Sequence, residues 1–104
     1  MSVVKLTQDN WNEKLSGHEG PIIIDFYADW CGPCVKMKPI MEAISMRKDI
    51  LVGKVNVDEE AKLKELFSIQ SIPTFVIYKD GSNPSDSKIV TGAMSQEDLL
   101  ALVE

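Results

Sequence analysis

The chain has 104 residues, of which 44% are hydrophobic and 26% are charged, and its formal net charge at pH 7 is −5. These values are those of an ordinary globular protein with one hydrophobic core, and we predict a single domain over residues 1–104. The acidic charge balance argues against a nucleic-acid partner, and no apolar run is long enough to span a membrane. The N-terminus lacks the basic and apolar segments of a secretory signal, so we expect a soluble, monomeric, cytoplasmic protein.

The chain alternates between segments with the apolar pattern of strands and segments with the pattern of helices. Pro21–Ala28 is apolar almost throughout, which is typical of a strand buried on both faces. Pro39 lies inside the longest predicted helix and is expected to kink it. In chain order the predicted elements are a strand over Val3–Leu6, a helix capped within Thr7–Asp9, a strand over Pro21–Ala28, a helix from Gly32 to about Lys48, a strand over Leu51–Val57, a helix over Glu59–Phe67, a strand over Thr74–Tyr78, an edge strand at Ile89–Val90 and a helix opened by Ser95.

This order, β-α-β-α-β-α-β-β-α, predicts an α/β fold. Strands that alternate with helices form parallel pairs joined by right-handed crossovers. The Asp80-Gly81 turn signal between the last two strands predicts an antiparallel hairpin. We therefore expect a mixed central sheet with helices on both faces.

The two cysteines of the chain, Cys31 and Cys34, lie where a predicted buried strand ends and a long helix begins. At the helix N-terminus, free backbone N–H groups favour the thiolate form of Cys31. Gly32 is expected to permit a tight turn, and Pro33 suits the first helical turn, where the missing N–H has no cost. Cys34 follows one turn later, within bonding reach of Cys31. The spacing predicts a reversible dithiol/disulfide pair.

A structural disulfide and a zinc site are the two alternatives to a redox role for the cysteine pair. A structural disulfide across four residues contributes only about 2 kcal/mol by the loop-entropy relation, which a chain of this length does not need. A zinc site requires four ligands, whereas the chain offers two cysteines and the distant His18, so only a site bridging two subunits is conceivable. Redox chemistry is the better interpretation, with no metal and no bound cofactor.

Asp25 is the second anomaly, because it places a carboxyl group inside the apolar segment Pro21–Ala28. Burial in apolar surroundings raises the pKa of a carboxyl group. We interpret Asp25 as a general acid/base that serves the dithiol from below, with Lys54 on the neighbouring predicted strand as its candidate partner. The alternative is an aspartate at the sheet edge or in an ion pair. For Pro73, just before a predicted strand, spacing alone favours an ordinary trans bond.

The segment Ile24–Asp29 followed by Trp30-Cys31-Gly32-Pro33-Cys34 resembles the thioredoxin family, and the resemblance covers essentially the whole chain. Ile72–Phe75 is similar to the cis-proline segment of that family, Lys54–Asp58 to its central strand and Thr91–Ala93 to its last loop. The resemblance implies the thioredoxin fold, a mixed central five-stranded sheet flanked by four helices.

The resemblance also implies roles for individual residues. Cys31 is the implied exposed nucleophile and Cys34 the implied buried resolving thiol, while Asp25 and Lys54 manage the proton of Cys34. Pro73 is implied to be cis, to pack against the disulfide and to keep metals away from the thiols. The implied docking surface, where a substrate strand pairs with the backbone of Ile72, consists of Trp30, Gly32, Pro33, Ile72, Pro73, Gly92 and Ala93.

The resemblance further implies disulfide-containing protein substrates and electrons supplied by a flavoprotein thioredoxin reductase. Three features depart from the usual pattern: Tyr27 stands where tryptophan is frequent, Val35 stands where a basic residue is common, and the segment Gly81–Gly92 is a few residues longer than usual. Two rival functions are an oxidant or isomerase of exported proteins and a redox-independent binding module. The neutral Gly32-Pro33 dipeptide argues against the first, and the intact dithiol makes the second at most an added role.

Overall fold

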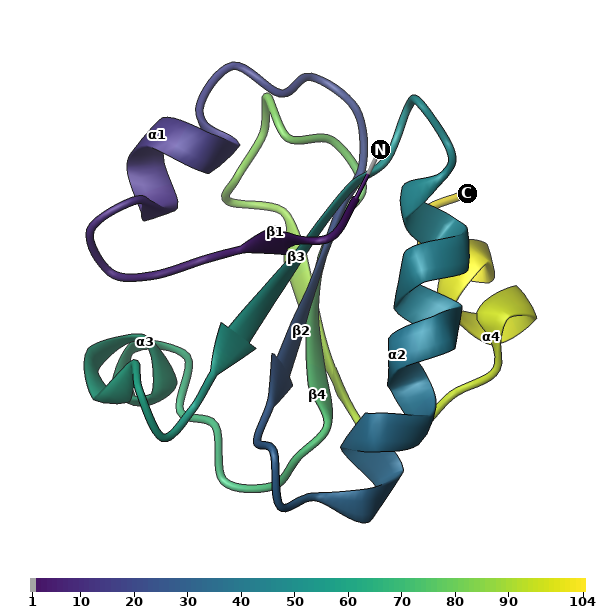
Figure 1. The fold of residues 1–104 in the computed structure, drawn as a ribbon. Coiled ribbons are helices and arrows are strands. Elements are labelled where there is room, and N and C mark those ends of the chain that lie inside the picture. Colours follow the sequence, from purple (N-terminus) through teal and green to yellow (C-terminus); the bar gives the residue numbers. More distant parts are fainter. Residues whose placement is uncertain (1) are drawn as a thin grey trace.

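A computed structural model describes residues 2–104; Met1, the first residue of the predicted domain, lies outside the described residues. The nine elements follow the predicted order (Figure 1). They are β1 (Val4–Lys5), α1 (Trp11–Leu15), β2 (Ile22–Tyr27), α2 (Gly32–Ser45), β3 (Leu51–Asn56), α3 (Ala61–Leu66), β4 (Thr74–Tyr78), β5 (Ser87–Thr91) and α4 (Gln96–Ala101).

The five strands form one mixed sheet in the order β1-β3-β2-β4-β5. β3 runs parallel to both β1 and β2, whereas β4 runs antiparallel to β2 and to β5, so the hairpin predicted at Asp80-Gly81 is confirmed. The crossover through α3 does not create another parallel pair, because β4 lies beside β2 rather than beside β3. β2 is therefore the central strand, and all six of its residues are buried.

The helices cover the two faces of this sheet in pairs. α1 and α3 pack on one face and α2 and α4 on the other, as the two separate groups of core residues show. Ile22, Ile24 and Phe26 of β2 belong to the first group, and Ile23 belongs to the second. Since side chains alternate along a strand, Asp25 shares the side of Ile23 and faces α2.

The positions at which the helices begin and end are set by local hydrogen bonds rather than by the pattern of apolar residues. Ser95 caps α4 by accepting a hydrogen bond from the Asp98 N–H at 3.1 Å, as predicted. Before α1, Thr7 and Asn10 each accept a hydrogen bond from the other's backbone N–H, and the helix begins after Asn10. α2 continues through Pro39 but ends at Ser45.

The predicted ends at Lys48 for α2 and at Glu59 for the start of α3 are therefore wrong by a few residues. The backbone N–H groups of both Glu59 and Glu60 donate to the carbonyl oxygen of Asn56, which makes a turn ahead of the helix. Across the described range, none of the helices is both long and apolar enough to cross a membrane.

Candidate active site

The two cysteines lie at the junction of β2 and α2, at the carboxyl end of the central strand. Cys31 is the residue just before α2, and the Cys34 N–H donates to its Sγ at 3.2 Å. Pro33 occupies the first helical turn. The two residues are joined by a disulfide with their Cα atoms 5.2 Å apart. The predicted placement of the pair at a helix N-terminus, within bonding reach, is confirmed.

Cys34 is buried, as the resemblance implies, but Cys31 is more enclosed than the resemblance implies. Cys31 is 5% exposed and Cys34 is 2% exposed, so in the disulfide form the expected exposed nucleophile is nearly as covered as its partner. One cause is the segment before β4, because Cys31 Sγ lies 3.8 Å from the carbonyl oxygen of Ile72. The backbone of Ile72 therefore covers part of the Cys31 sulfur.

Gly32 begins α2 without a left-handed backbone, and a Cβ atom added to it meets nothing within 4 Å. The backbone conformation at this position therefore does not itself require a glycine. What glycine provides is a bare surface next to the disulfide, because it and Pro33 are both exposed.

The segment that carries Pro73 lies against the disulfide. The Ile72–Pro73 peptide bond is cis, the isomer that the resemblance implies. Pro73 is buried, and its carbonyl oxygen accepts the Gly92 N–H at 2.8 Å. This bond brings the loop after β5, with the exposed residues Gly92 and Ala93, beside the proline.

Trp30 is the most exposed large apolar side chain next to the cysteines, at 72%. Its indole Nε1 donates a hydrogen bond to Oδ2 of Asp58 at 2.9 Å, which holds the ring against the segment that follows β3. Sequence reasoning did not identify Asp58, although its position just after a strand that parallels β2 puts it at the same edge of the sheet.

Asp25 is a buried carboxyl group without a neutralising partner at contact distance. It is 5% exposed, and within residues 2–104 its Oδ1 has no hydrogen-bond partner. Burial raises the pKa of this carboxyl group from 3.8 to about 7, and the positive charge of Lys54 partly opposes the rise. The alternatives of an edge-facing or ion-paired aspartate are both wrong, because β2 is central and the ion pairs that the described residues form are Lys5–Glu59 and Arg47–Asp49.

Lys54 lies directly opposite Asp25 in the parallel β2–β3 register. Its Nζ is 6.0 Å from the ring centroid of Tyr27, at the outer limit for a cation–π contact. Lys54 therefore acts on Asp25 through space, while its ammonium group lies over a tyrosine at the position where the family frequently has tryptophan.

A small pocket of about 110 Å³ lies between the Asp25 carboxyl group and Cys34. Asp25, Cys34 and Lys54 line it together, as do Lys38 and Glu42 of α2, which sequence reasoning missed. Helical spacing could have identified both, because they follow Cys34 by four and eight residues and so lie on the same face of α2. The site thus combines a disulfide, a protonatable carboxyl group and a hollow between them. In the part of the chain that the structure describes, no three His, Cys, Asp or Glu side chains gather to hold a metal ion.

A pH-dependent stability is expected from Asp25. The folded carboxyl group, with its pKa of about 7, holds a proton that the unfolded chain releases near its ordinary pKa of 3.8. The free energy of unfolding should therefore fall as the pH rises from about 4 to about 7, and level off above that. The Asp25→Asn variant should lose this pH dependence, and above pH 7 its free energy of unfolding should be higher than that of the parent by as much as a few kcal/mol. The gain arises because each unit of raised pKa corresponds to about 1.4 kcal/mol, and it is reduced by the cost of an unsatisfied amide, about 1–3 kcal/mol. Denaturant unfolding of the oxidised protein between pH 4 and 9 measures both curves.

Lys54 provides the control for this assignment. Lys54→Met removes the charge that lowers the pKa of Asp25, so the carboxyl titration followed by NMR should move above pH 7. Lys36→Met removes an exposed charge of α2 that does not line the pocket and should leave the titration unchanged. An Asp25 pKa near 4 in the parent protein would contradict the assignment.

Comparison of the chain with models of known protein families identifies its family. Residues 2–104 match the family model described as Thioredoxin. The chain belongs to the thioredoxin family. A thioredoxin of Chlamydia caviae is 32% identical over 99 residues, which cover 94% of this chain and 92% of that protein. A thioredoxin-like protein of Synechocystis is 41% identical over 80 residues, covering 75% and 76% of the two chains.

Solved thioredoxin structures agree with the fold. A mutant thioredoxin from Halobacterium salinarum has a TM-score of 0.85 and 28% identity, with 99% of this chain and 88% of that chain covered. Chloroplastic thioredoxin z has a TM-score of 0.87 and 26% identity, with 99% and 92% covered. The predicted thioredoxin fold is confirmed. With the disulfide between Cys31 and Cys34, membership of the thioredoxin family makes the protein a thiol–disulfide oxidoreductase. The family in general implies disulfide substrates and a reductase partner.

Proposed function

We propose that the protein is a protein disulfide reductase and a general electron donor of the cytosol, itself reduced by a flavoprotein thioredoxin reductase. The observation that carries the proposal is the Cys31–Cys34 disulfide at the N-terminus of α2, above a carboxyl group with a pKa of about 7. A proton acceptor that is half ionised at neutral pH suits a thiol that must lose its proton in each cycle.

Substrate docking is the first step. The residues expected to form the docking surface with Ile72 include Trp30, Gly92 and Ala93, which carry no charge and are all exposed. Among the described residues, neither the N–H nor the C=O of Ile72 makes a backbone hydrogen bond, so both are available to pair with an extended substrate segment. Such pairing would align a substrate disulfide with Cys31 Sγ.

The reaction is two successive thiol–disulfide exchanges. The Cys31 thiolate attacks one sulfur of the substrate disulfide, the substrate S–S bond breaks, and the second substrate sulfur leaves as a thiolate. Cys34 then attacks Cys31 Sγ in the mixed disulfide, which releases the first substrate sulfur and forms the Cys31–Cys34 disulfide. The substrate gains two electrons and two protons, and the protein dithiol supplies the electrons.

Proton transfer accompanies the second exchange. Cys34 attacks as a thiolate, so its proton must leave, and Asp25 is the buried carboxyl group that lines the same small pocket. Lys54 keeps part of the carboxyl population ionised and therefore able to accept a proton. Pro73, buried against the disulfide, would exclude metal ions from the two sulfur atoms.

The test is reduction of insulin disulfides by the full chain with NADPH and thioredoxin reductase. We expect catalytic turnover that depends on both proteins, and none from the Cys31→Ser, Cys34→Ser double variant. A function that the double variant retains in full would favour the redox-independent binding module. Efficient oxidation of reduced substrates, with no insulin reduction, would favour the oxidant.

A further inference from the structure

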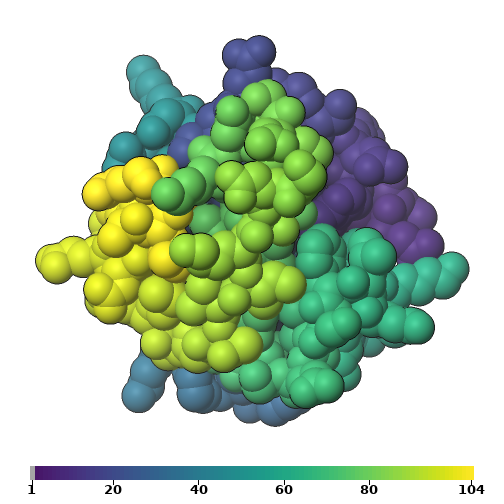
Figure 2. Space-filling view, turned by 180° about the vertical axis from the view of Figure 1, so that it is seen from behind, coloured from purple at the N-terminus to yellow at the C-terminus, as the bar shows by residue number. Residues whose placement is uncertain are grey.

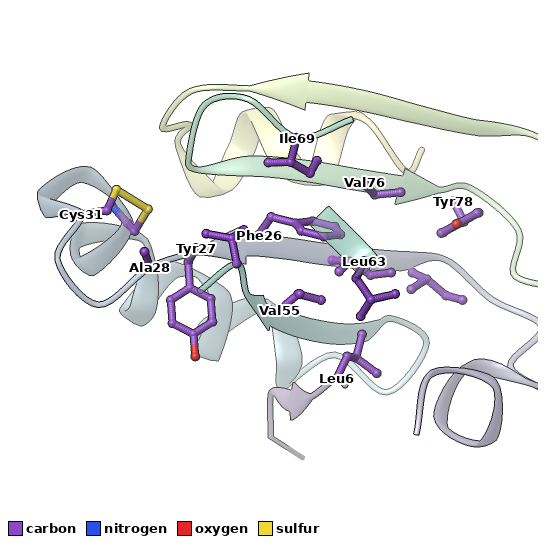
Figure 3. Packing of buried hydrophobic residues seen from close by; sticks show 14 residues of the cluster. Leu6, Phe26, Tyr27, Ala28, Cys31, Val55, Leu63, Ile69, Val76 and Tyr78 are labelled. Atoms are coloured by element: carbon purple, nitrogen blue, oxygen red, sulfur yellow. A yellow bond between two sulfur atoms is a disulfide. The ribbon is translucent and has the colours of Figure 1, made fainter. Parts of the chain in front are cut away.

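A second and larger pocket lies at the end of the sheet opposite to the disulfide. Its volume is about 490 Å³, within the range of small-molecule sites. Tyr78, which lines it, pairs with Ile22 at the start of β2, whereas the cysteines follow the end of β2. Figure 3 shows the same separation, with Tyr78 and Cys31 at opposite ends of the buried cluster. The pocket is therefore separate from the dithiol site.

The lining of this pocket carries no charged side chain, although 26% of the whole sequence is charged. A charged ligand would lose water here without gaining a partner, which is unfavourable. The lining residues come from α1, the turn after it, the first residue of β2, the last residue of β4 and the loop before β5. They are Trp11, Asn12, Leu15, Ser16, Gly17, Ile22, Tyr78, Gly81, Ser82 and Pro84. The composition favours an uncharged ligand.

The Tyr78 hydroxyl group is an unused hydrogen-bond donor at this pocket. Tyr78 is 9% exposed, and among residues 2–104 its hydroxyl group has no protein hydrogen-bond partner, while its oxygen keeps some contact with solvent. Burial raises the pKa of this phenol, so the group is a neutral O–H donor at physiological pH. A donor of this kind gains most from an acceptor that enters with a ligand.

The aromatic wall of the pocket is held in place. The Trp11 ring packs against Phe67 with ring centroids 5.4 Å apart, so the indole is fixed from behind. Flat aromatic surfaces favour stacking or edge contacts with another ring. A planar, ring-bearing ligand therefore fits the wall better than a flexible chain.

The opposite wall is formed by the loop after β4 and is clamped to the turn after α1. The Gly81 N–H donates to the Gly20 carbonyl oxygen at 2.8 Å, and a Cβ atom at Gly81 would collide with the His18 carbonyl oxygen. Figure 2 shows this green loop beside the purple N-terminal segment. The wall belongs to the segment Gly81–Gly92, which the resemblance indicates is longer than usual for the family.

We propose that the pocket binds a small, uncharged molecule with one planar ring and a hydrogen-bond acceptor, the ring against Trp11 and the acceptor on the Tyr78 hydroxyl group. The site is independent of thiol–disulfide exchange. It neither requires the dithiol nor touches the docking surface around Ile72.

Benzamide is the probe for this proposal, because it is neutral and planar and carries a carbonyl acceptor. Titration followed by NMR should shift the Trp11 indole N–H and the Gly81 and Ser82 amides, with a Kd of about 1 mM for a ligand of this size. Benzoate has the same ring with a negative charge and should bind at least about tenfold more weakly. Equal binding of benzoate, or shifts at Trp30 and Gly92 instead, would overturn the proposal.

Tyr78→Phe separates the hydroxyl group from the shape of the pocket. The variant should weaken benzamide about fivefold and leave toluene, which has no acceptor, unchanged. Tyr27→Phe removes a hydroxyl group outside the pocket and should change neither. Unaltered benzamide binding to Tyr78→Phe would contradict the proposal.

Discussion

Replacing Cys34 with serine is expected to turn the protein into a covalent trap for its substrates. Cys31 can still attack a substrate disulfide, but no second thiol is present to release the mixed disulfide. Catalytic insulin reduction should fall to the rate of the added reductant alone, and substrate should accumulate on Cys34→Ser at close to one molecule per chain. Non-reducing electrophoresis and intact-mass measurement detect the complex.

Cys31→Ser is the matched control, because it removes the other sulfur from the same site. The remaining thiol of Cys34 is 2% exposed and lies behind Cys31, so it should capture almost no substrate. The single variants should also differ toward iodoacetamide, with Cys34→Ser alkylated much faster than Cys31→Ser. Equal trapping by both variants, or faster alkylation at Cys34, would reverse the two assigned roles.

The elements that the sequence predicted best are those whose pattern has one physical explanation. The almost continuously apolar segment around Ile24 is typical of a strand covered on both faces, and β2 is the central strand. The Asp80-Gly81 turn signal likewise indicated an antiparallel hairpin, which β4 and β5 form. The position of β4 beside β2 was not predictable in this way, since pairing between distant strands depends on the packing of the whole sheet and not on local pattern.

The cysteine pair and Asp25 were predictable from the sequence, but their contacts were not. Asp25 was identifiable because a carboxyl group inside an apolar strand is a conspicuous exception, and its burial is confirmed. Its lack of an ion pair with Lys54 depends on where a long flexible side chain comes to rest, here over Tyr27. The enclosure of Cys31 by Ile72 joins segments 41 residues apart and has no local signature.

The second large effect concerns the direction of electron flow. We expect a reduction potential more negative than that of glutathione, by at least about 30 mV, which is about a tenfold difference in the equilibrium constant. A protein becomes a strong oxidant when its surroundings stabilise the nucleophilic thiolate, because this stabilises the reduced form. The potential therefore depends on how much positive charge surrounds Cys31 Sγ.

Few groups around Cys31 carry positive charge that would stabilise its thiolate, and one neighbouring group is negatively charged. The Cys34 N–H is a backbone donor to its Sγ, at 3.2 Å, and Gly32 and Pro33 between the cysteines are neutral. His18, the one histidine of the chain, contacts the carbonyl oxygen of Pro21 at the start of β2, at the other end of the sheet. Asp29, two residues before Cys31, adds negative charge at the surface. The thiolate should be favoured only moderately, which leaves the disulfide stable and the dithiol a good donor.

Equilibration of the protein with glutathione buffers of known ratio measures this potential. The parent chain should be mostly oxidised in a buffer poised at the glutathione potential. Pro33→His places a titratable cation between the cysteines and should move the potential toward that of glutathione, because the added charge stabilises the Cys31 thiolate. Val35→His adds the same group at an exposed position beyond the cysteine pair and should move it less. A parent chain that stays mostly reduced under oxidising glutathione would show that it acts as an oxidant and not as a reductase.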